Sequence, residues 1–144
     1  MRLFAKRVSD PEVCFCQNVL EVLDGLSRVT TNVAWIAIAR RVLNERGLMY
    51  IIDKHGENIG GYIVEECYPS DRRELMNHAE ALFEIATTGV DWRTDSEVLT
   101  ALRRVISKMG LYDAEKRELL YKYLYGGEKN EISEMVVDMM VNSF

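Results

Sequence analysis

Along residues 71–144, hydrophobic side chains recur every three or four positions in four successive stretches. At this period side chains share one face of an α-helix, so each stretch predicts an amphipathic helix. The apolar positions of the four predicted helices are Leu75, Ala79, Leu82, Phe83 and Ala86; Val98, Leu102, Val105, Ile106 and Met109; Leu119, Leu120, Tyr123 and Leu124; and Ile132, Met135, Val136, Met139 and Met140.

Capping residues separate these stretches. Asp71 with Glu74, and Thr94 with Glu97, have the spacing of capping boxes, in which side chains satisfy the first backbone N–H groups of a helix. The third and fourth helices can be opened by Asp113 and by Asn130 or Glu131, and the glycines that can end helices are Gly89, Gly110, Gly126 and Gly127. The joints are short, which predicts an antiparallel helical core.

Two further helices are predicted in the first half of the chain. Asp10 and Pro11 supply an N-cap and a first-turn proline, and the helix that they open is expected to end at Gly25. The second helix is expected to begin near Asn32 and to end at Gly47. Their apolar positions are Cys16, Val19, Leu20 and Leu23 in the first and Trp35, Ile38, Ala39 and Val42 in the second.

Residues 48–66 break the helical pattern. The aromatic and β-branched side chains at 50–52 and again at 62–64 favour strands. Between them, residues 54–57 predict a turn in which Gly56 takes a positive φ. The segment therefore predicts a small β-hairpin.

Together these elements predict a mainly α fold, a bundle of about six helices with one small β-hairpin near residues 48–66. A chain of 144 residues fits a single domain, 1–144. Within it, residues 1–68 are expected to hold two helices and the hairpin, and residues 69–144 the four-helix region.

Composition limits the classes of function. Hydrophobic residues make up 48% of the chain and charged residues 28%, which is typical of a soluble globular protein. No apolar run approaches the roughly 18 residues that span a bilayer, and the N-terminus lacks the apolar stretch of a secretion signal, so we expect a cytoplasmic protein. The net charge of −5 is divided into +2 over residues 1–50 and −7 over the rest, which disfavours nucleic acid as a partner.

The candidate chemistry is sparse. The three cysteines are odd in number and lack metal-ligand spacing, so reduced cysteines are expected. His55 lies in the predicted turn, and His78 shares a helix face with Glu74, which predicts a surface pair with no nucleophile beside it. No complete catalytic motif occurs in the sequence, and no cofactor is expected.

The joint before the second C-terminal helix is acidic. Asp91, Asp95 and Glu97 are candidate metal ligands, because hard cations take carboxylate oxygens. The alternating acids and central glycine of an EF-hand loop are absent. Asp95 and Glu97 are also explained by their places in the first turn of a helix. The sequence therefore favours a capped joint over a metal site.

A group of short motifs follows one another between Ala79 and about Asp138. They are Ala81-Leu82-Phe83-Glu84-Ile85-Ala86, Gly89-Val90-Asp91, Thr94 with Glu97, Met109-Gly110-Leu111 and Glu118-Leu119-Leu120. This order resembles the TerB-like all-α family, named for a tellurite-resistance protein. The resemblance implies successive helices joined by short turns. In that family the turn usually presents Asp-Gly with acids placed for a metal or polar partner, and this chain departs from it there.

Three other segments support a competing interpretation. Residues 2–12 are similar to a first strand and turn, residues 51–66 to a strand hairpin, and residues 91–102 to the loop that holds the pyrophosphate of acyl-CoA in GNAT acetyltransferases. That loop uses small glycines so that backbone N–H groups can approach the phosphates, and here the positions hold Thr94, Ser96 and Val98. This alternative also requires a central strand at residues 75–87, where the period predicts a helix.

The last predicted helix carries the most specific candidate surface. Met-rich helical faces are adaptable and occur at partner-binding grooves, so the predicted partner-binding residues are Met135, Val136, Met139 and Met140. A terminal apolar face can equally close the core, and both alternatives remain open. The sequence favours a non-catalytic protein–protein interaction or adaptor module, which binds a protein partner or a second copy. The alternative is an acyl-CoA N-acyltransferase or a pseudo-enzyme derived from one.

Overall fold

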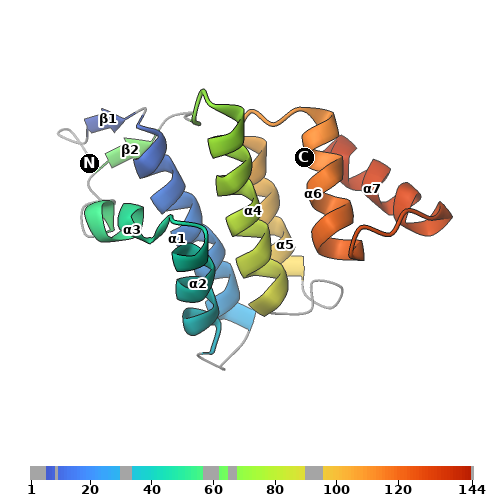
Figure 1. The fold of residues 1–144 in the computed structure, drawn as a ribbon, viewed down its shortest axis with the longest axis horizontal. Helices are drawn as coiled ribbons and strands as arrows, with labels where there is room; N and C mark the ends of the chain where they lie inside the picture. The colour runs from blue at the N-terminus through green and yellow to red at the C-terminus, as the bar shows by residue number, and fades with distance from the viewer. Residues whose placement is uncertain are drawn as a thin grey trace.

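The computed structural model describes residues 6–8, 10–29, 34–56, 62–64, 68–89 and 96–143. Within these ranges the chain forms seven α-helices and two short strands (Figure 1). The elements are β1 (Lys6–Val8), α1 (Pro11–Val29), α2 (Ala34–Glu45), α3 (Met49–His55), β2 (Tyr62–Val64), α4 (Arg72–Gly89), α5 (Ser96–Ser107), α6 (Asp113–Tyr125) and α7 (Glu131–Ser143). The predicted mainly α fold is confirmed, with one helix more than expected.

Helix α4 is central to the packing. It contacts α1, α2, α5 and α6, while α1 also contacts α3 and α5 (Figure 1). One hydrophobic core takes buried side chains from every helix. The apolar positions predicted for α4 and α5 all lie in it, as the helical period indicated. Helix α7 packs chiefly against α6, at the edge of this arrangement.

Three of the six predicted helix starts are confirmed by their hydrogen bonds, and those near Asn32 and at Thr94 lie outside the described residues. Asp10 and Asp71 each accept the backbone N–H two residues further on, at 2.9 and 2.8 Å. At the start of α7, Asn130 Oδ1 accepts the Ser133 N–H and Ser133 Oγ accepts the Asn130 N–H, both at 2.9 Å. This reciprocal pair satisfies the first donors of α7. The prediction for α6 is wrong by one residue, because Asp113 is its first helical residue and not its cap.

Gly25 has a different role from the predicted one. The expectation that the first helix ends there is wrong, since α1 continues to Val29. Gly25 is buried and faces α5, where an added Cβ would lie 3.3 Å from the Cβ of Ala101. The two small residues let α1 and α5 approach closely, so the glycine serves packing and not termination.

The predicted hairpin at 48–66 is also wrong. Its first arm is α3, and Gly56 has a helical φ of −58° instead of the positive φ expected of a turn. Leu48 and Ile51 are buried and Ile52 packs against the core, a spacing that suits a helix lying on α1. This burial outweighs the strand propensity of Ile51 and Ile52. The second arm, β2, is a strand, but it pairs in parallel with β1.

A polar network fixes α6 on α4. Arg46, just after α2, donates from Nε to Glu84 at 3.0 Å, from Nη1 to Glu80 at 3.3 Å and from Nη2 to the Tyr123 hydroxyl at 2.8 Å. Lys122 of α6 donates to Glu80 at 2.7 Å. These groups satisfy one another between α4, α6 and the residue that follows α2, and all but Lys122 are half-buried or better. Helix α6 is thereby held as a platform for α7.

The joint between α5 and α6 is fixed by the start of α4. Arg72 pairs with Glu115, donates to the carbonyl of Gly110 at 3.3 Å and lies 4.0 Å from the centre of the Tyr112 ring. Gly110 has a φ of +68°, and a Cβ there would lie 2.7 Å from the ring of Tyr68. Both the backbone conformation and the contact therefore require glycine at this position.

Candidate protein-binding site

Helix α7 has one side committed to the core. Ser133, Val137 and Val141 are buried there, and Met140 is partly buried and packs against the same cluster. These positions follow a helical spacing of three and four residues, which places them on one face. The buried face is therefore centred about one residue away from the stripe that the sequence predicted.

A second apolar surface on α7 is exposed to solvent. Ile132, Met135 and Met139 are 68%, 59% and 67% exposed, and Val136 beside them is intermediate. Their spacing of i, i+3 and i+7 aligns them along the helix. We call these four residues the apolar edge of α7. They are the largest group of exposed hydrophobic side chains on any one helix in the described part of the chain.

The four predicted partner-binding residues divide between these two surfaces. Met135, Val136 and Met139 lie on the apolar edge, and Met140 turns toward the core. Sequence periodicity grouped them because all are apolar at helical spacing. Periodicity could not show that the apolar surface of α7 is wider than its contact with α6. The part of that surface beyond the contact stays uncovered.

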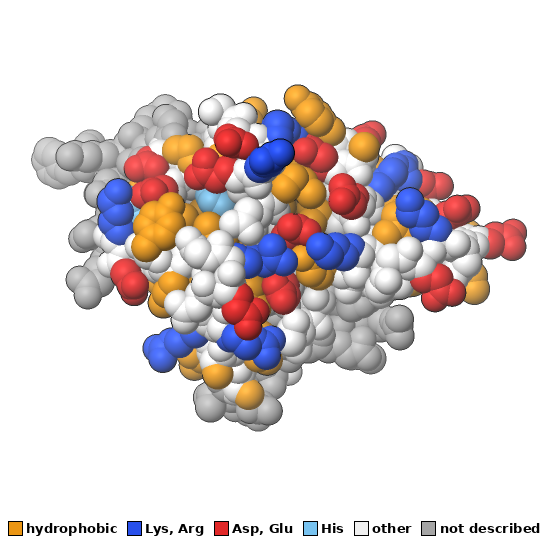
Figure 2. Space-filling view, viewed as in Figure 1, with side chains coloured by type: hydrophobic (Ala, Val, Ile, Leu, Met, Phe, Trp, Pro, Cys, Tyr) orange, Lys and Arg blue, Asp and Glu red, His pale blue; other side chains and the backbone are white. Residues whose placement is uncertain are grey.

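Acidic residues border the apolar edge along its other side. Glu131, Glu134 and Asp138 are exposed, and Asp138 pairs with Arg117 of α6. The sequence of α7 contains no Lys or Arg. In Figure 2 acidic side chains extend to the right-hand end of the molecule, where α6 and α7 lie. The apolar edge is thus flanked by negative charge.

The metal candidates are only partly visible. Asp91 and Asp95 lie outside the described residues, and Glu97 is exposed in the first turn of α5. Among the residues that the structure does describe, no group of three or more His, Cys, Asp or Glu side chains is arranged to hold a metal ion. The described part of the joint therefore adds no support for a metal site.

Both histidines lie near the carboxylate of Glu12. Nothing in the sequence connected Glu12 with either of them. His55 Nε2 lies 2.9 Å from Glu12 Oε1, and this hydrogen bond lowers the pKa of Glu12. His78 was expected at the surface but is buried against Phe15, with ring centres 4.4 Å apart. Burial lowers the pKa of His78 to about 4, opposed by the charge of Glu12. Glu74, its expected partner, is 4.0 Å away.

The described groups around the two histidines are either engaged with one another or buried. Among the described residues, His78 Nε2 has no hydrogen-bond partner and stays neutral above its low pKa. The Glu12 carboxylate is engaged by His55 and by Lys54 at 3.2 Å. General acid–base chemistry needs a substrate within hydrogen-bond reach of such groups.

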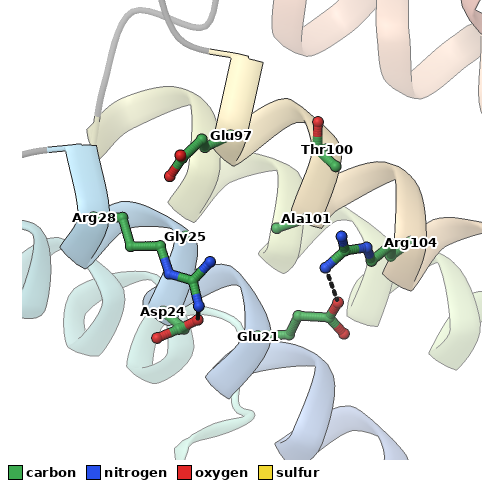
Figure 3. A pocket seen from close by; sticks show the side chains of 8 residues that line it. All are labelled: Glu21, Asp24, Gly25, Arg28, Glu97, Thr100, Ala101 and Arg104. Carbon is green, nitrogen blue, oxygen red and sulfur yellow. Dashed lines mark ion pairs between the residues drawn. The ribbon is translucent and has the colours of Figure 1, made fainter.

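The structure also contains a groove of about 230 Å³ between α1 and α5 (Figure 3). Its two arginines are engaged with acids of the same groove: Arg28 lies 2.9 Å from Asp24, and Arg104 lies 3.8 Å from Glu21. The groove forms where Gly25 and Ala101 bring the helices together. An incoming charged ligand would have to displace existing ion pairs, so the groove is a weaker candidate than α7.

The expectation that the cysteines are reduced is wrong for Cys14. Cys14 is disulfide-bonded, with a partner outside the described residues, whereas Cys16 is free and buried. Burial raises the pKa of the Cys16 thiol, which makes it a poor nucleophile at neutral pH. Neither cysteine therefore adds a reactive group to the surface near α7.

Comparison with known proteins adds no identification. No protein-family model matches the chain, and no curated protein and no solved structure matches it. None of the helices in the described residues is long and apolar enough to cross a bilayer. The functional assignment therefore depends on the geometry of the chain itself.

Proposed function

We propose that this protein is a non-catalytic interaction module that binds a protein partner through the apolar edge of α7. The observation that carries the proposal is the exposure of Ile132, Met135 and Met139, each more than half exposed and aligned on one helix. Exposing several large apolar side chains together costs solubility and offers nothing to the monomer's core. A partner that covers them gains their burial.

The geometry of α7 combines the two roles that the sequence left open. Val137 and Val141 hold the helix on its own core, and Met135 and Met139 lie on the uncovered side. A helix fixed on one face presents the other without a large loss of conformational entropy on binding. Methionine side chains then adapt to the partner's shape.

The acetyltransferase alternative receives no support from α4. That fold would need a central strand at residues 75–87, and these residues lie within a helix. The order of α4, α5 and α6 supports a TerB-like helical arrangement as part of the proposal. An interaction module needs no cofactor, so the proposal requires none.

Site-specific photo-crosslinking in the source cell tests the proposal. A photoreactive amino acid at Met135 should give a discrete adduct that disappears when Met139→Ser is added. The same photoreactive group at Leu20 or Ile36, which are 40% and 39% exposed away from α7, is the matched control. Equal labelling at all positions, or a Met135 adduct that persists with Met139→Ser, would contradict binding through the apolar edge.

A further inference from the structure

We propose that the partner of the apolar edge is an amphipathic helix whose apolar face is flanked by Lys or Arg. This inference rests on the proposed function and adds the chemistry of the partner. It follows from three features of α7, namely the spacing of its exposed residues, the sign of the charges beside them and the symmetry that a second copy would impose.

The spacing of the apolar edge suits a helix. Ile132, Met135 and Met139 stand at i, i+3 and i+7, so they form a line about two helical turns long. Recognition between a helix and an apolar helical surface uses anchors at these intervals. Val136 and Met140, both partly buried, continue the apolar surface toward α6 and so widen the area that an incoming helix can cover.

The charge beside the edge that no ion pair balances is negative. Glu131 and Glu134 are exposed, and neither joins an ion pair within the residues that the structure describes. Asp138, the third acid of the row, already pairs with Arg117. A partner with basic flanks would place cations opposite Glu131 and Glu134, whereas an acidic partner would meet like charges.

A second copy of the chain fits this surface poorly. Dimers most often form about a two-fold axis, so each α7 would meet the same residues of the other. An antiparallel pair would bring the acidic row of Glu131 and Glu134 against its own image. A parallel pair would place each acidic row against the apolar side near Val136. Since α7 holds no Lys or Arg, neither arrangement provides a complementary charge.

A membrane surface is disfavoured by the same charges. Amphipathic helices that lie on membranes carry Lys and Arg beside their apolar face, because the lipid headgroups are anionic. The acids beside the apolar edge would be repelled from such a surface. A basic helix is therefore the occupant that both the shape and the charge of α7 favour.

Two synthetic peptides test the inference with the full chain. Both are about 18 residues long with leucines at i, i+3 and i+7; one carries Lys on its flanks and the other Glu. Fluorescence anisotropy should show the Lys peptide binding at least about tenfold more tightly than the Glu peptide. Raising the salt from about 0.05 to about 0.5 M should reduce that preference.

Three variants locate the binding. Met135→Ser with Met139→Ser should abolish binding of the Lys peptide, and Glu131→Lys with Glu134→Lys should reverse the preference toward the Glu peptide. The matched control is Glu45→Lys with Asp53→Lys, which makes the same change of charge at exposed positions on α2 and α3. It should leave the preference unchanged. A control as effective as the α7 pair would show a general charge effect and overturn the inference.

The remaining outcomes separate the inference from the proposed function. Equal binding of both peptides, lost in the methionine variant, would overturn the basic partner and keep the interaction module. A dimer in sedimentation that the methionine variant dissociates would likewise overturn the basic partner and keep the interaction module. Binding to anionic vesicles that requires the same methionines would replace the protein partner by a membrane and overturn both proposals. If neither peptide binds, and no self-association or photo-crosslink depends on Met135 and Met139, both proposals fail.

Discussion

Helices α5 and α7 carry similar apolar stripes but meet different surroundings. The five positions that the sequence predicted as the apolar face of α5 are all buried, four of them within the helix and Met109 just after its end. In α7 the corresponding positions Ile132, Met135 and Met139 are more than half exposed. Helix α5 contacts both α1 and α4, whereas α7 packs chiefly on α6. A stripe shows that a face is apolar, and its neighbours decide whether the face is covered.

The difference also separates stability from binding. A covered stripe contributes to the free energy of folding through burial and close packing. An uncovered one contributes little until a partner arrives. Substitutions in α5 should therefore unfold the protein, and substitutions on the apolar edge of α7 should leave the fold intact.

Leu102→Ala in α5 should have the largest effect. Leu102 is fully enclosed between α5 and its neighbours, so truncation removes its burial and leaves a cavity. The loss in the free energy of unfolding should be about 3 to 5 kcal/mol, measured by urea denaturation. A loss below about 1 kcal/mol would mean that α5 is no better covered than α7.

Acid should weaken the covered region through His78. Its pKa is about 4 in the folded chain and 6.5 ordinarily, so the unfolded chain takes up the proton first. The stabilisation from keeping His78 neutral is complete above pH 6.5 and is lost as the pH falls toward 4. The shift corresponds to about 3 kcal/mol.

The His78 effect is measured by difference. The pH dependence of unfolding for the wild type should be steeper between pH 6.5 and 4 than that of His78→Leu, which has no proton to gain. Parallel curves for the two proteins would show that His78 is not buried as the packing against Phe15 implies.

Val137→Ala should have an intermediate effect, because Val137 holds α7 on its core. The expected loss is about 2 kcal/mol in the free energy of unfolding. Amide hydrogen exchange should accelerate in α7 before it does in α4, since α7 packs chiefly on α6 whereas α4 contacts four helices. Uniform acceleration along the chain would contradict the peripheral place of α7.

Met139→Ser should have the smallest effect on stability, within about 0.5 kcal/mol, as is usual for an exposed position. Its side chain is 67% exposed. The comparison with Val137→Ala, two residues away, distinguishes the two sides of one helix in thermal melts. A loss for Met139→Ser as large as that for Val137→Ala would mean that the edge is part of the core.

Much of the fold follows from local signals in the sequence. The caps at Asp10, Asp71 and Asn130 depend on side chains within three residues of the groups that they satisfy, so they could be predicted. The start of α3 could not, because its helical state depends on burial of Leu48 and Ile51 in a core formed by other helices. Propensity alone favoured a strand there.

The candidate site was predictable only in part. Its methionines were visible as a stripe, but their division between Met139 outside and Met140 inside depends on where α6 meets α7. The burial of His78 and the packing role of Gly25 depend likewise on partners far away in the sequence, Phe15 and Ala101. Such contacts leave no periodic signal along the chain.

The methionine methyl groups provide the most direct test of binding at the apolar edge. Met135 and Met139 lie on the edge, whereas Met109 is 3% exposed in the core. With methyl-labelled methionine, NMR signals can be followed while the Lys-flanked peptide is added. The account predicts that the Met135 and Met139 signals shift and saturate together while Met109 stays fixed. Met135 and Met139 signals that stay unchanged at saturating peptide would contradict the account.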